Sequence, residues 1–446
     1  MIRLVFCDLR DHAATWAGAF AIAVACGYLG GWVASLTATF SIYPRLQGLT
    51  LTMLPFSLIA AVAVLVPAAN LTVSAQRRSY ALWQLAGVSP RRVGVVVLTQ
   101  LAVVAVLGAA CGTLVEAATF APLFPGVFSS PFYQPIDRVV LDAGLPLMPV
   151  VWLVVAGVFL LGGLRGARSA AATPPLAALR DPEPKHRGMT WLRMLLFAGL
   201  ATGACGLAWY LLSSEPEAAM DSSLFLPLLA VAVLVPVAPL VFSALLGAWT
   251  SVVPQARWNA WYLARRMARN GLASSTSVEA PIMVGVGLLV GIFSLSNVLG
   301  VYAQQRGMVG WSTSLDWTST LLLLGGPVLL CAVGAAVGVV MTSRSRTRDV
   351  ALLIASGARP ATLVASAACE AFIHAITATL AGVGAAVASN AVVAVAVGGM
   401  PLFGGLAFGE GLVVALVGFA LVLVATLVPT WAALNREAAT VLAVQE

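Results

Sequence analysis

Few side chains in this sequence are suited to chemistry, and most of them lie far apart. Histidine occurs only at His12, His186 and His374, a spacing that fits no metal site. Glu370 and His374 are four residues apart, so on a helix they share a face within pairing distance. A carboxylate in an apolar membrane segment is costly unless it is paired, hydrated or protonated. The pair could act in gating or coupling, and the simpler interpretation is a buried helix-packing contact.

Other chemistry is not indicated, and we expect no catalytic residue, no metal ligand set and no enzyme activity in this chain. The single lysine, Lys185, lies in DPEPKHRG, which is not a glycine-rich phosphate loop. The six cysteines form no obvious pairs, so we expect no disulfide. Glu116 follows a long apolar run and is interpreted as an interfacial residue. Gln100 is a further polar residue inside an apolar run.

Composition identifies the elements that must position these residues. Of 446 residues, 60% are hydrophobic and 9% are charged, and mean hydropathy is +0.97. A soluble protein of this size could not bury that much apolar surface, and alternating β-barrel patterns are absent. The sequence predicts an all-α polytopic membrane protein with about ten transmembrane helices. Their expected ranges are 13–38, 51–74, 93–118, 145–164, 191–213, 223–249, 281–303, 319–342, 361–388 and 409–433.

The distribution of basic residues predicts the orientation. With a cytoplasmic N-terminus, all of the 24 lysines and arginines except Arg45, Arg138 and Arg306 fall on the inner side. Both termini are therefore expected in the cytoplasm, and residues 1–12 are expected to form an interfacial helix. The arginines lie in short loops beside the spans, so a nucleic-acid partner is not indicated. Arginine, alanine and valine are abundant, which favours the cytoplasmic membrane of a high-GC bacterium.

The chain contains an internal repeat. SAQRRSYALWQLAGVSPRRVGVVVLTQ precedes and enters the third span, and TSRSRTRDVALLIASGARPATLVASAACE precedes and enters the ninth. Aligning Gly87 with Gly357 also aligns Pro90 with Pro360, and places Gln100 opposite Glu370. Each unit has four spans, so the two repeats are parallel, and two bridging helices join them.

Each copy predicts the same local structure. A basic cluster is followed by a short amphipathic helix, a glycine just past its C-terminus, and a proline that starts the next span. A helical hairpin turn with topogenic arginines would have this pattern, but its occurrence at two equivalent places favours a docking element. The candidate docking residues are Arg77, Arg78, Ala81, Leu82, Trp83, Gly87 and Pro90 in the first copy and Arg348, Asp349, Leu352, Leu353, Gly357 and Pro360 in the second.

These two segments resemble the FtsX-like permease domain of the ABC transporters related to MacB, LolC and BceB. The resemblance implies a ten-span, type VII-like permease. Its expected parts are an interfacial helix at 1–12, a first repeat at 13–180, a linker with two bridging spans at 181–250, a cytoplasmic amphipathic helix at 251–280, and a second repeat at 281–446. The sequence departs from the family where Ser79 replaces an acidic residue and where no large external domain is present.

The resemblance implies that the paired segments are coupling helices, each docking one ATPase subunit on a separate chain. This chain then binds no cofactor, and ATP and magnesium belong to the partner ATPase. The expected activity is export or extraction of an amphipathic substrate such as a lipid, lipopeptide, drug or antimicrobial peptide. One alternative is an ATPase-linked sensor or mechanotransmitter with a histidine kinase or accessory protein as partner. Another is an ATP-independent secondary transporter that uses Glu370.

Overall fold

The computed structural model describes most of the chain. It covers residues 8–10, 12–43, 47–129, 139–172, 191–253, 258–270, 272–307, 315–398 and 405–434. The DPEPKHRG segment, the C-terminal residues 435–446, and residues 1–7 of the predicted N-terminal helix lie outside these ranges.

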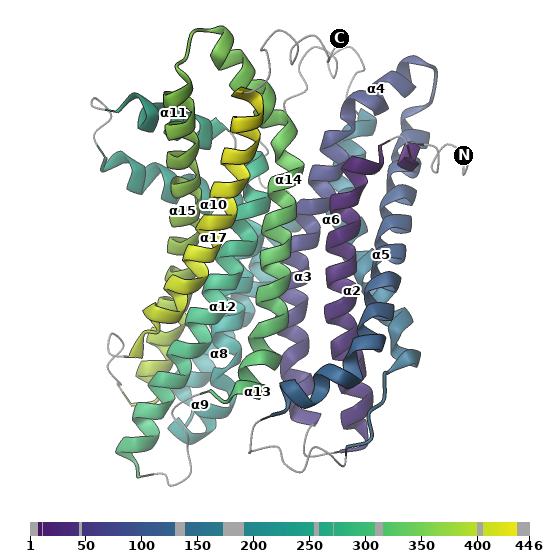
Figure 1. Ribbon diagram of the computed structural model, residues 1–446. Helices are drawn as coiled ribbons and strands as arrows, with labels where there is room; N and C mark the ends of the chain where they lie inside the picture. The colour runs from purple at the N-terminus through teal and green to yellow at the C-terminus, as the bar shows by residue number, and fades with distance from the viewer. Residues whose placement is uncertain are drawn as a thin grey trace. The chain divides into compact units, whose positions relative to one another are not determined.

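Ten helices among these described residues are long and apolar enough to cross a membrane, in agreement with the predicted number of spans. No strand occurs in the described ranges, so that part of the chain is all-α (Figure 1). The spans are α2 (Ala13–Ser41), α3 (Gln47–Ala75), α5 (Pro90–Val127), α6 (Met148–Ala172), α8 (Trp191–Ser213), α10 (Phe225–Ser251), α12 (Leu272–Gln305), α14 (Gly326–Ala355), α15 (Pro360–Ala396) and α17 (Phe408–Leu434). The shorter elements are α4 (Arg77–Leu85), η4 (Leu145–Leu147), α9 (Pro216–Ser223), α11 (Asn259–Asn270), α13 (Trp317–Thr320) and the π-helical η6 (Leu321–Gly325).

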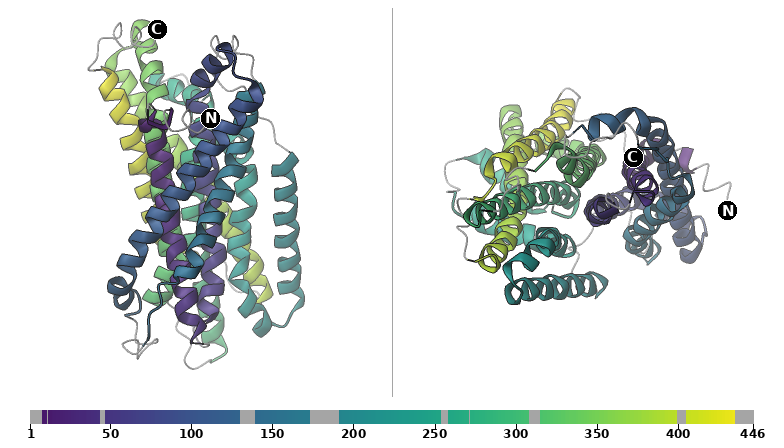
Figure 2. Two further views of the ribbon diagram at one scale, coloured as in Figure 1. Left: turned by 90° about the vertical axis from the view of Figure 1, so that its right-hand side faces the viewer. Right: turned by 90° about the horizontal axis from the view of Figure 1, so that it is seen from below.

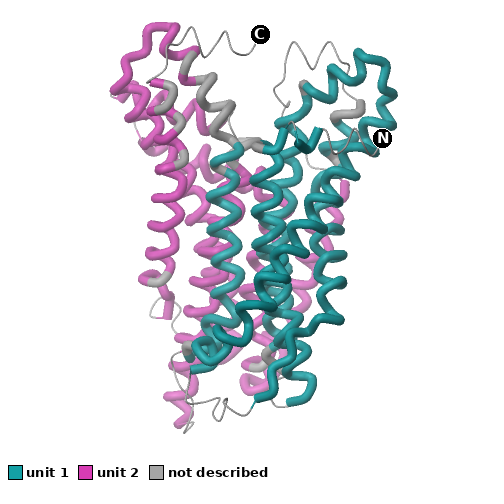
Figure 3. Tube along the Cα trace, turned by 45° about the vertical axis from the view of Figure 1, so that its right-hand side comes forward, with its two compact units in different colours: residues 1–186, 316–341 teal, residues 187–315, 342–446 magenta. Residues whose placement is uncertain are grey.

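The chain forms two compact units, coloured separately in Figure 3. Unit 1 contains residues 1–186 and 316–341, and unit 2 contains residues 187–315 and 342–446. The predicted second repeat is thus divided, because the first part of α14 packs in unit 1. Gly334 on α14 meets Val64 of α3, and Gly326 meets Leu29 of α2.

Unit 2 is built around α15, which packs against α10, α11, α12 and α17. The helix α8 lies beside α10 at the margin of this unit (Figure 2). Most of its side chains are exposed, and Leu211 is its one buried residue. Because α8 is apolar over most of its length, this exposure is the expected state of a helix that faces lipid.

A close crossing of two long helices occurs in each unit. Gly112 on α5 lies so near α2 that a Cβ there would be 2.1 Å from the Val24 carbonyl oxygen. Gly382 on α15 is similarly close to α12, because a Cβ there would be 2.6 Å from the Met283 carbonyl oxygen. Glycine allows such backbone approach, which stabilises helix pairs where no hydrophobic drive exists. The two glycines are 270 residues apart, the same spacing as Gly87 and Gly357.

We expect Gly382→Ala to destabilise the protein by about 1–3 kcal/mol, because the new Cβ would displace backbone atoms of α12. Thermal unfolding of the purified protein in detergent would measure this as a lower Tm. Gly384→Ala is the matched control, since nothing lies within 4 Å of that Cβ position on the same helix. Equal Tm changes for the two variants would contradict the close crossing.

The two predicted amphipathic helices outside the spans of the second repeat differ from the structure. The short helix expected in the second docking segment is not separate, because α14 continues through it to Ala355. The predicted amphipathic helix at 251–280 is shorter: α11 covers Asn259–Asn270, and α12 begins at Leu272. Residues 272–280 therefore belong to α12 rather than to a separate interfacial helix, and the apolar span within α12 begins at Thr276.

Candidate functional site: two matching turns and the buried polar groups behind them

The first predicted docking segment ends in a rigid glycine turn. Gly87 has a φ of 93°, a left-handed conformation that disfavours every residue with a Cβ. Its amide donates to the Gln84 carbonyl at 3.0 Å, and the Val88 amide donates to the Trp83 carbonyl at 3.0 Å. These two bonds form a Schellman motif. Pro90 then begins α5 at the position where a missing N–H costs nothing, as predicted.

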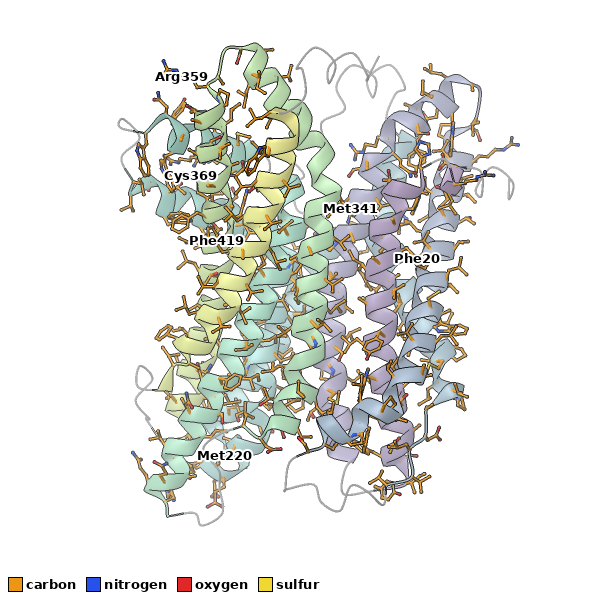
Figure 4. The ribbon with its side chains drawn as sticks, in the orientation of Figure 1. Phe20, Met220, Met341, Arg359, Cys369 and Phe419 are labelled. Atoms are coloured by element: carbon orange, nitrogen blue, oxygen red, sulfur yellow. The ribbon has the colours of Figure 1, made fainter. Side chains whose placement is uncertain are left out.

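The second segment has the same turn. Gly357 has a φ of 91°, and its amide donates to the Ile354 carbonyl at 2.9 Å. The Ala358 amide donates to the Leu353 carbonyl at 3.0 Å. Pro360 begins α15, and Arg359, labelled in Figure 4, is the residue before it. The predicted glycine cap and proline start are therefore confirmed in both copies, with matching hydrogen bonds at a spacing of 270 residues.

Each segment exposes a leucine at the position five residues before its turn glycine. Leu82 is 52% exposed and Leu352 is 49% exposed. In the first copy Leu85 is also exposed, whereas Ala81 is buried. Leu353 is half-buried among Val350, Leu363 and neighbouring apolar side chains. The side chains of Arg78, Arg348 and Asp349 lie outside the part of the structure that is described.

Polar side chains fix α4 to the rest of unit 1. The Tyr80 hydroxyl donates to Gln76 Oε1 at 2.6 Å and lies 3.5 Å from Gln100 Oε1 on α5. Gln100 Nε2 donates to Asp8 Oδ2 at 2.7 Å, and Arg77 donates to the Ser169 hydroxyl on α6 at 3.2 Å. These hydrogen bonds link α4 to α5, to α6 and to the N-terminal segment. Sequence reasoning identified Gln100 but missed Asp8, which it placed on the membrane surface.

Burial keeps the Tyr80 hydroxyl of this network protonated. Tyr80 is fully buried, and Trp83 packs edge-on against its ring with the centroids 5.4 Å apart. Burial, and then the nearby Asp8 carboxylate, raise the pKa of Tyr80 above its usual value. The phenol thus keeps its proton and acts as a donor. Burial also lowers the pKa of Arg77.

In unit 2, the predicted Glu370–His374 pair belongs to a three-residue cluster. His374 Nε2 lies 3.6 Å from Glu370 Oε1 on the same helix, which confirms the predicted approach. His374 Nδ1 pairs with Glu279 Oε1 of α12. Glu279 is fully buried, and the other two side chains are 5–6% exposed. The cluster joins the two helices that cross at Gly382, and charge or proton transfer is the chemistry that it could perform.

Sequence reasoning missed Glu279 because the predicted span began at residue 281. Hydropathy windows exclude a charged residue at the end of an apolar run, so the residue was assigned to an interfacial helix. The signal that could have found it is His374 itself. A histidine inside a span requires a partner, and one partner on its own helix leaves the second ring nitrogen to be satisfied from another helix.

Glu116 is also more buried than predicted. The sequence indicated an interfacial residue, but the side chain is 0% exposed between α5 and α2. Its carboxylate lies against Gly31, where a Cβ would be 2.8 Å from Oε2. Within the described ranges neither carboxylate oxygen has a hydrogen-bond partner.

No protein-family model, no curated protein and no solved structure that was compared with this chain matches it.

Proposed function

We propose that this chain is the permease subunit of an ABC transporter, whose ATPase is a separate polypeptide. The observation that supports this most directly is the pair of glycine turns. They share backbone conformation, hydrogen bonds, proline start and an exposed leucine, although their surroundings differ. A turn needed only to reverse the chain has no requirement for an exposed leucine, whereas a surface that docks the same partner twice does.

The turns are suited to transmitting force. Each is held by Schellman bonds on one side and by a proline-started helix on the other, so it moves as a rigid body. The first turn leads into Gln100 and its link to Asp8. The second leads into α15 and the cluster of Glu370, His374 and Glu279. Displacement of a turn by an ATPase would therefore move one side of a buried polar contact in each unit.

The cargo that best fits this chain is amphipathic and enters from the bilayer. The ten described spans are apolar, and many of their large side chains are exposed. A lipid, lipopeptide, hydrophobic drug or antimicrobial peptide is the corresponding class. Two docking turns imply two ATPase subunits per permease, on the cytoplasmic side of a bacterial membrane.

The test is affinity purification of the chain from its native membrane, followed by mass spectrometry of the copurified proteins. We expect an ABC-type ATPase at two copies per permease. Recovery of a histidine kinase without cargo-dependent ATPase stimulation would favour a sensor instead. Recovery of no ATPase would overturn the proposal.

A second candidate is ATP-independent secondary transport, and the buried cluster favours it. Three titratable side chains with almost no exposure lie together inside the spans. Such groups carry protons or ions in many transporters. Transport that persists without any ATPase but is lost in Glu370→Gln would support this candidate and exclude the first.

A further inference from the structure

The helix α11 carries a cluster of arginines for which the described residues provide no counter-charge. Arg265, Arg266 and Arg269 lie within two turns of this helix. None of them has an acidic side chain within ion-pair distance among the described residues. Three neighbouring guanidinium groups repel one another unless an anion lies between them.

The need for a counter-charge is greatest at Arg265. Its side chain is only 8% exposed, and its Nε has no hydrogen-bond partner among the described residues. Burial, followed by the nearby Arg269 and Arg266, lowers the pKa of Arg265 from its usual value. A guanidinium nevertheless stays charged in proteins, so an anion bound beside Arg265 would stabilise this part of the described structure.

The neighbouring aromatic residues indicate where this anion comes from. Trp258, directly before α11, is 66% exposed, and Tyr262 on α11 is 45% exposed. Arg266 stacks over the Tyr262 ring at 5.5 Å from its centroid. Exposed Trp and Tyr beside arginines on an amphipathic helix are typical of the membrane–water interface, where the rings lie among headgroups.

The opposite face of α11 fixes the helix at one depth. Trp261, Ala264 and Ala268 are buried against Leu246 of α10 and Ile373 of α15. Cys369, labelled in Figure 4, lies in the part of α15 that this face covers. The Arg269 guanidinium lies over Gly247, 3.3 Å from the position of a Cβ there. Gly247 is one turn from the end of α10, so this guanidinium lies at the level where a span meets the headgroups.

We propose that Arg265, Arg266 and Arg269 form a binding site for the phosphate of an anionic phospholipid headgroup. Arginine binds phosphate oxygens through paired N–H donors, and Trp258 and Tyr262 contact the glycerol and upper acyl region of the same lipid. The helix α11 also contacts the residues around the second glycine turn. Leu263 of α11 packs against Val350 and Leu363, which lie on either side of that turn in the sequence. This inference does not depend on the ATPase.

The test is native mass spectrometry of the full-length purified chain titrated with phosphatidylglycerol, with phosphatidylcholine in parallel. We expect phosphatidylglycerol to bind more tightly, and R266Q/R269Q to weaken it about 25-fold, about fivefold for each arginine. R306Q is the matched control. Arg306 stacks over Tyr302 at 5.3 Å in the same manner, but it is remote from the arginine cluster, so its loss should leave phosphatidylglycerol affinity unchanged.

Further arms separate the possible outcomes. R266K/R269K keeps the charge and should retain most of the affinity. This result would also show that the chain folds with both arginines replaced. Inorganic phosphate at millimolar concentration should not displace the lipid, and displacement would assign the site to free phosphate instead. Equal affinity of R266Q/R269Q and the unaltered chain would overturn the proposal. The proposal would also be overturned if R266Q/R269Q bound lipid normally but no longer copurified with a protein, because the arginines would then be a protein-docking surface.

Discussion

Replacing Leu82 and Leu352 together by aspartate is expected to abolish copurification of the ATPase while the permease remains folded in the membrane. Both side chains are about half exposed at matching positions before the two glycine turns, so neither contributes much to the internal packing. If they enter a pocket of the ATPase, each aspartate places an unpaired charge in a desolvated contact. We expect each single variant to weaken association at least about 30-fold, which corresponds to about 2 kcal/mol.

Leu82→Met and Leu352→Met are the matched controls, because methionine keeps the volume and apolar character of the side chain. These variants should retain the ATPase. The measurement is the ratio of ATPase to permease after purification, with size-exclusion profiles to show that each variant is intact. An unchanged ratio in the double aspartate variant would mean that the turns do not dock the partner.

Glu279→Leu is expected to be the most destabilising single substitution in the buried cluster of unit 2. Removing one member of a buried charged pair leaves the other without compensation, which costs about 3–5 kcal/mol. His374 would keep only Glu370, whose carboxylate is 3.6 Å away. Thermal unfolding in detergent should show a large fall in Tm. Glu217→Ala, which removes an exposed carboxylate on α9, should leave Tm almost unchanged.

A double-mutant cycle makes this prediction specific to the pair. His374→Leu alone should also destabilise the protein, whereas Glu279→Leu with His374→Leu should cost less than the sum of the single effects. Strict additivity would mean that the two side chains do not interact. A further variant separates stability from activity, because Glu279→Gln keeps a hydrogen-bond acceptor for His374 and removes only the charge.

Local sequence was sufficient for much of the fold. The ten spans follow from apolar length, and their ends agree to within a few residues in most cases, as at 191–213. The glycine turns follow from residue type, because only glycine adopts the φ values found at Gly87 and Gly357 without strain. The Glu370–His374 approach follows from helical spacing.

The parts that sequence did not predict depend on which helices pack together. Asp8 meets Gln100 across 92 residues, and Glu279 meets His374 across 95. No local pattern encodes either contact, since side chains from different helices come together only through tertiary packing. The burial of Glu116 against Gly31 has the same origin. The two docking segments also differ in their helices. Gln76 separates α4 from α3, whereas α14 runs without a break to Ala355.

Site-specific photocrosslinking from the two turns tests the central claim most directly. A photoreactive amino acid would replace Leu82 or Leu352 in native membranes, with Trp209 on the exposed face of α8 as the control position. We expect positions 82 and 352 to capture the same ABC-type ATPase, identified by mass spectrometry, and position 209 to capture none. Capture of no ATPase from either turn, in membranes where the permease is intact, would contradict it.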